Sequence, residues 1–98
     1  MFKIGDIIKP SEKLTALIKY KFADDNNDFF EDREILFVML TGVYERQTTM
    51  ASVFFKDGDE IENSTFRVAP EELKGEVVLC NGMAIAKINT GWVKSGRI

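Results

Sequence analysis

The 98-residue sequence contains no histidine and a single cysteine, Cys80. Without histidine, the chain cannot form the Ser–His or Cys–His pairs of many hydrolases, and nearly all zinc sites are excluded. A lone cysteine excludes an internal disulfide and is typical of a protein from the reducing cytosol. No phosphate-binding loop or nucleophile–base pair is recognisable. We therefore expect a cytoplasmic protein that is not an enzyme and uses no cofactor and no metal.

Long apolar runs are also missing. The longest, Ile35–Leu40, has six residues, whereas a membrane-spanning helix needs about 20. The amino terminus reaches Asp6 before the apolar part of a signal peptide could form. We expect no membrane partner.

The apolar residues that are present are enough for one core. Hydrophobic residues make up 45% of the chain and include eight phenylalanines, so we expect a single domain over residues 1–98. The run Ile35–Leu40 follows an acidic segment and is followed by Thr41-Gly42. A short apolar run bounded in this way predicts a central strand that is covered on both faces.

Two interpretations compete for residues 14–22. Ser11 could cap a helix that carries Leu14 and Ile18 at helical spacing. Apolar and polar residues also alternate along most of the segment, most clearly in Lys19-Tyr20-Lys21-Phe22. Alternation is typical of a half-buried strand, and on this ground we predict a strand with at most a helical turn near Ser11.

Two dipeptides predict tight hairpins. Asp57-Gly58 fits a two-residue turn that would place Phe54 opposite Ile61. Asn81-Gly82 predicts a second hairpin over residues 76–88, and both of its faces are apolar. That hairpin is expected either between two layers or against a partner, and Val78→Asp is expected to unfold the protein.

Further strands are expected at the start of the chain, ending at Pro10, and at Met50–Phe55, Thr65–Val68 and Trp92–Lys94, with a short helical turn at Pro70–Leu73. Many short strands with almost no helix predict a mostly β fold, a small barrel or sandwich of antiparallel hairpins. Phe2-x-x-Gly5-Asp6-x-Ile8 resembles the opening strand of SH3-like barrels of the KOW and Tudor kind. Val68–Leu73 resembles the helical turn before the last strand of such barrels. The resemblance implies the fold and assigns no functional residue.

Acidic residues are concentrated in two segments. The net charge is −3, yet residues 24–34 and 57–76 each carry −5, and both ends of the chain are basic. Clustered carboxylates favour docking on a basic protein surface. At least one ring of Phe29-Phe30 is expected to be buried, either in the core or in a partner, and we favour a contact site. The alternative is that the charges only solvate the surface. The predicted protein-binding residues are Asp24, Asp25, Asp28, Phe29, Phe30, Glu31 and Asp32.

The first acidic segment partly matches a calcium-binding loop. Asp24, Asn26 and Asp28 have the spacing of the first ligands of an EF-hand. Phe29 and Ile35 stand where that loop needs glycine and glutamate. We therefore expect a solvated loop.

Three functions remain open. The favoured one is a protein-binding module, compatible in size and acidity with a phage-type regulator or inhibitor of a nucleic-acid-processing protein. The second is a single-stranded nucleic-acid-binding barrel, which requires the strands at the two ends of the chain to pair. The net negative charge is unfavourable for this function, because an acidic protein repels nucleic acid at long range. The third is self-association as a homodimer through residues 76–88. The nucleic-acid-binding candidates are Lys19, Tyr20, Lys21, Trp92, Lys94 and Arg97.

Overall fold

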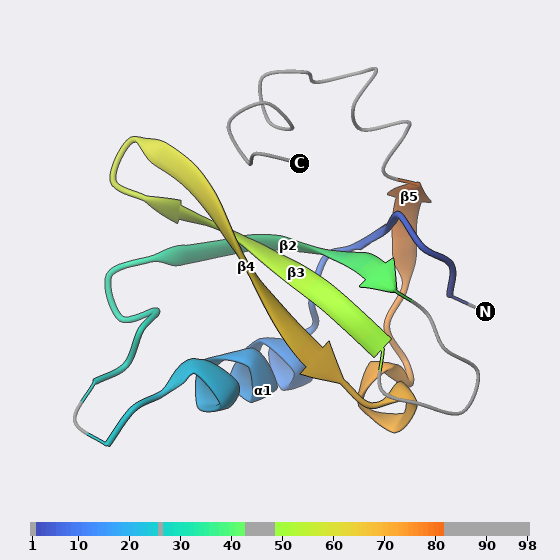
Figure 1. The fold of residues 1–98 in the computed structure, drawn as a ribbon, viewed down its shortest axis with the longest axis horizontal. Helices are drawn as coiled ribbons and strands as arrows, with labels where there is room; N and C mark the ends of the chain where they lie inside the picture. The colour runs from blue at the N-terminus through green and yellow to red at the C-terminus, as the bar shows by residue number, and fades with distance from the viewer. Residues whose placement is uncertain (1, 26, 43–48, 82–98) are drawn as a thin grey trace.

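The computed structural model describes residues 2–25, 27–42 and 49–81, which form one antiparallel sheet, one α-helix and one 3-10 helix (Figure 1). The elements are β1 (Asp6–Ile8), α1 (Glu12–Phe22), β2 (Glu34–Gly42), β3 (Thr49–Asp57), β4 (Glu60–Val68), η1 (Pro70–Leu73) and β5 (Val78–Asn81). The strand order is β4-β3-β2-β1-β5. The prediction of a mostly β fold is confirmed. Over the described ranges the sheet does not close into a barrel.

The strand β2 occupies the middle of the sheet, as predicted from its apolar run. On one face Val38 and Leu40 are fully buried in the larger core. On the other face Phe37 is buried and stacks on Phe54 of β3, with ring centroids 4.6 Å apart. A strand with apolar side chains on both faces must be buried on both, and the central-strand prediction is confirmed.

The larger core lies between the sheet and α1, which crosses one side of the sheet in Figure 1. Leu14 and Ile18 are the fully buried residues of α1, and they pack against side chains of β2, β3 and β4. The two residues are four positions apart, so they lie on one stripe of the helix. This single stripe attaches α1 to the sheet.

The strand predicted for residues 14–22 is wrong, because this segment is the helix α1. The side chain of Ser11 accepts a hydrogen bond from the Leu14 amide at 3.2 Å, which satisfies one of the unpaired donors at the helix start. Lys19 and Lys21 lie in the last turn, where they complement the helix dipole. The alternation would have buried Tyr20, yet this residue is 80% exposed. The helical interpretation, which the sequence also allowed, is the one that buries a continuous stripe.

The start of α1 is tied to a residue far along the chain. The Glu76 carboxylate accepts hydrogen bonds from the Ser11 amide at 2.9 Å and from the Ser11 hydroxyl at 2.5 Å. These two residues are 65 positions apart. A charged acceptor strengthens both bonds. The contact therefore joins the helix start to the segment that enters β5.

We expect Ser11→Ala to lower the free energy of unfolding by about 1 kcal/mol, the usual effect of losing a helix cap. Glu76→Ala should cause a similar loss. Because the two side chains share hydrogen bonds, the double variant should lose less than the sum of the single losses. Urea unfolding of the four proteins measures this, with Glu71→Gln, an exposed acid on η1, as a control that should shift by less than about 0.5 kcal/mol. Fully additive losses would contradict the contact.

The predicted β3–β4 hairpin is confirmed, but its register is two residues away from the prediction. Asp57 pairs with Glu60, so the turn residues are Gly58 and Asp59. Gly58 has a φ of 63°, which glycine adopts without strain at the first position of a tight hairpin turn. Phe54 therefore lies opposite Asn63 rather than Ile61. A shift of two residues preserves the faces of a strand.

The chain after β4 follows the predicted order. The short helical turn is the 3-10 helix η1, and Gly75 follows it with a φ of 91°. Strand β5 then pairs antiparallel with β1, and Ile7 lies opposite Cys80. The part of the predicted 76–88 hairpin beyond Asn81 and the predicted Trp92–Lys94 strand lie outside the described residues. Among the described helices, none is long and apolar enough to cross a membrane.

Candidate functional site

The loop that joins α1 to β2 is anchored by Phe29-Phe30. Phe30 is 2% exposed, and its ring packs edge-to-face against Phe22 at 5.4 Å and Phe55 at 5.3 Å. Phe29 is partly buried and packs on the same two rings. Aromatic pairs of this geometry stabilise a cluster beyond the area that they bury. Phe30 is therefore a core residue and offers no ring to a partner, unlike the contact role that the sequence suggested.

The first part of the loop is held by its own hydrogen bonds. The backbone groups of Asp24 and Asn27 bond to each other in both directions, at 2.8 and 3.1 Å. The Asp28 carboxylate accepts a hydrogen bond from the Phe30 amide at 3.0 Å. In the part of the chain that the structure describes, no group of three or more acidic or cysteine side chains could hold a metal ion. The acidic side chains point outward from hydrogen-bonded turns, and the five predicted acids are all exposed.

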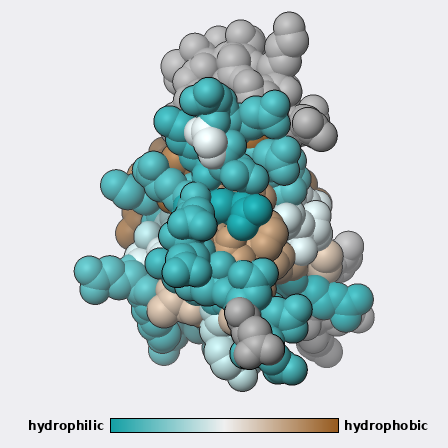
Figure 2. All heavy atoms as spheres, turned by 90° about the vertical axis from the view of Figure 1, so that its left-hand side faces the viewer, coloured by the Kyte–Doolittle hydropathy of each residue, from teal (hydrophilic) through white to brown (hydrophobic). Residues whose placement is uncertain are grey.

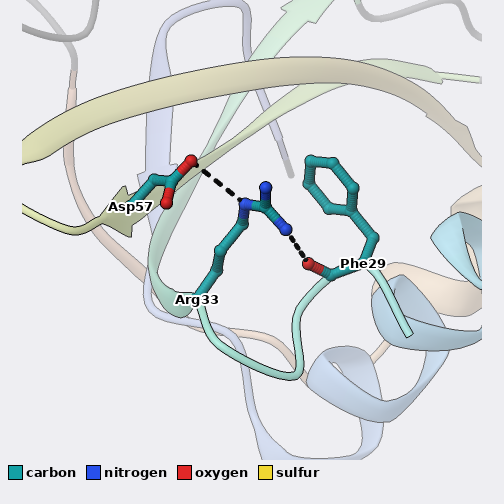
Figure 3. Close-up of polar contacts among 3 residues, drawn as sticks. All are labelled: Phe29, Arg33 and Asp57. Atoms are coloured by element: carbon teal, nitrogen blue, oxygen red, sulfur yellow. Dashed lines mark hydrogen bonds and ion pairs between the residues drawn. The ribbon is translucent and has the colours of Figure 1, made fainter. Parts of the chain in front are cut away.

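Arg33 connects this loop to the sheet (Figure 3). Its Nη1 donates to the backbone oxygen of Phe29 at 2.6 Å, and its Nε lies 3.3 Å from Asp57 Oδ2. The guanidinium group also lies over the Phe29 ring, 4.3 Å from the centroid. One cation thus contacts a backbone oxygen, a carboxylate and an aromatic face. Sequence reasoning assigned Arg33 no role; its position as the one basic residue among acids was the available signal.

The Arg33–Asp57 pair brings the first acidic segment beside the start of the second. We call the exposed acids of the loop and of the β3–β4 turn the acidic side of the molecule. Figure 2 views this side and shows hydrophilic side chains over most of it, around a small apolar area. The later acids of the second segment lie elsewhere: Glu72 is on η1, where it pairs with Lys21 at 3.5 Å and accepts a hydrogen bond from the Ala69 amide. The acidic side consists of Asp24, Asp25, Asp28, Glu31, Asp32, Asp57, Asp59 and Glu60.

The nucleic-acid-binding hypothesis required its first three candidate residues to lie on a strand. Lys19, Tyr20 and Lys21 lie on α1 and not on a strand. Trp92, Lys94 and Arg97 lie outside the described residues. Because residues 19–21 are helical, they cannot form the first strand of the proposed pair.

Two shallow hollows flank the outward face of α1. The first is an open hollow of about 550 Å³ between the end of α1 and the acidic loop. The second, of about 420 Å³, lies between α1 and η1 and contains Glu71 and Glu72. The residues lining the first, which we call the Tyr20 hollow, are Ala16, Lys19, Tyr20, Ala23, Asp24, Asn27 and Asp28.

No protein-family model, curated protein or solved structure matches the chain. The proposals that follow therefore rest on the geometry of the molecule alone.

Proposed function

We propose that the protein is a small non-enzymatic module that binds a partner protein by docking its acidic side on a basic surface. The observation that carries the proposal is that exposed carboxylates of two segments, about 25 to 35 residues apart in the sequence, lie on the side of the molecule where the Arg33–Asp57 ion pair joins those segments. Close-set negative charges resemble the phosphates of a nucleic-acid backbone. The basic groove of a nucleic-acid-processing protein is the surface that they suit best, as expected of a phage-type regulator or inhibitor.

The anchoring of the acidic loop to the sheet supports this function. Phe30 in the core and Arg33 across to Asp57 both hold the loop against the sheet. A loop that is already held in one conformation loses less conformational entropy when it binds. A loop whose charges only improve solubility does not need a fixed conformation. The anchoring of this loop therefore favours a role as a contact surface.

The SH3-like fold and the cytoplasmic location are part of the same proposal. The resemblance is supported by the order of the described elements, in which the helical turn η1 precedes β5 and β5 pairs with β1. SH3-like barrels bind proteins and nucleic acids in many unrelated settings. The fold therefore suits a binding module without selecting the partner.

Capture of partners from a lysate of the native host tests the acidic side. The variant with Asp24, Asp25, Asp28, Glu31 and Asp32 changed to Asn or Gln should lose the partners that the wild type captures. Wild-type capture should also weaken between 0.1 and 1 M salt, because the Debye length falls from about 10 to 3 Å. Self-association through apolar surface would persist at high salt.

Two charge-matched variants separate the location of the acids from net charge. Glu31→Gln/Asp32→Asn removes two charges from the acidic side, and Glu12→Gln/Glu71→Gln removes two from exposed positions on α1 and η1. We expect reduced capture with the first pair and wild-type capture with the second. Equal recovery of the same partners by the wild type and the five-acid variant would overturn the proposed function.

A further inference from the structure

Tyr20 is the most exposed of the large apolar and aromatic residues that the structure describes outside loops, at 80%. It lines the Tyr20 hollow together with the small residues Ala16 and Ala23. Asp24 and Asp28 line the same hollow. An exposed aromatic ring and two carboxylates thus line the same open hollow.

The carboxylates in this hollow retain capacity to bind a donor. Asp24 Oδ1 accepts the Asp25 amide and Asp28 Oδ1 accepts the Phe30 amide, each at 3.0 Å. Among the described residues, no hydrogen bond or ion pair uses the second oxygen of either carboxylate. Both side chains are exposed at the end of α1. An incoming cation can therefore pair with them without breaking the loop.

The ring and the carboxylates together match a guanidinium group. Guanidinium is planar, stacks on aromatic faces and pairs with carboxylates through a fork of N–H donors. The molecule already holds one guanidinium in this way, because Arg33 lies over Phe29 and contacts Asp57. Lys19 also lines the Tyr20 hollow, and its single positive charge leaves the lining net negative.

We propose that the Tyr20 hollow is the anchor pocket for an arginine side chain of the partner, stacked on Tyr20 and paired with Asp24 or Asp28. This inference rests on the proposed function and adds to it the chemistry of the partner residue. It also reassigns Tyr20 from contacts with bases to contact with a guanidinium. The pocket should prefer arginine to lysine, since an ammonium group has no planar face to stack.

Titration of the ¹⁵N-labelled full chain with two nine-residue peptides, (Arg-Gly-Ser)₃ and (Lys-Gly-Ser)₃, tests the inference at low salt. The arginine peptide should shift the amide signals of Ala16, Tyr20 and Ala23 and bind more tightly than the lysine peptide. Tyr20→Ala should weaken the arginine peptide by roughly 3- to 30-fold, the range of a cation–π contact. Tyr20→Phe, which keeps the ring, should bind as the wild type does.

The outcomes separate the pocket from the proposed function. If Tyr20→Ala binds the arginine peptide as the wild type does while Glu31→Gln/Asp32→Asn weakens it, the anchor pocket is wrong and the acidic side stands. Equal binding of the two peptides would also overturn the pocket, because charge alone would then explain the affinity. If neither peptide binds, or if neither variant changes binding, the pocket is overturned, whereas the acidic docking side stands or falls with the capture of partners by the five-acid variant.

Discussion

Val38→Asp is expected to abolish folding at neutral pH. Val38 is fully buried in the central strand β2 and faces the core under α1. A carboxylate placed there would have no partner, and an unpaired buried charge costs several kcal/mol. The whole stability of a small domain is about 5–15 kcal/mol. Far-ultraviolet circular dichroism and the dispersion of amide proton signals should both report an unfolded chain.

The matched control is the same substitution on β5. Val78 is 37% exposed, so the carboxylate of Val78→Asp can remain in water and the variant should fold. The sequence-based prediction that Val78→Asp unfolds the protein assumed a buried Val78, and the exposure of this residue removes that assumption. A folded Val38→Asp would contradict the central position of β2, and an unfolded Val78→Asp would contradict the exposure of β5.

The parts of the fold that were predictable are those in which one local signal decides the structure. Ile35–Leu40 is too apolar for any exposed position and too short for a typical helix, so only a central strand fits. Gly58 and Gly75 mark real turns, because both adopt positive φ values. For 14–22 the helical and alternating patterns coexist, and neither pattern alone decides. Packing decides, since Leu14 and Ile18 fill the space over the sheet.

For the candidate site, the sequence identified individual residues but not how they are arranged. The sequence identified the acids of the loop, and those acids are exposed. It indicated that Phe29 or Phe30 would be buried in either the core or a partner, and only the fold shows that Phe30 enters the core. The contacts that assemble the surface are long-range: Arg33 reaches Asp57 across 24 positions. No spacing rule connects residues so far apart, because their contact depends on how the sheet and the loop pack.

Phe30→Ala is expected to lower the free energy of unfolding by about 3–5 kcal/mol, the usual cost of removing a buried phenylalanine ring. The loss should be large because Phe30 contacts Phe22, Phe29 and Phe55 and is 2% exposed. Urea unfolding measures it.

Tyr20→Ala removes a ring of similar size from a position that is 80% exposed. We expect this control to change the free energy of unfolding by less than about 0.5 kcal/mol. The contrast tests the anchoring of the acidic loop directly, since Phe30 is the only one of these two rings that joins the loop to the sheet. If Phe30→Ala and Tyr20→Ala lowered the free energy of unfolding equally, the Phe30 ring could not anchor the loop. The argument that the acidic side is held in one conformation before binding would then fail.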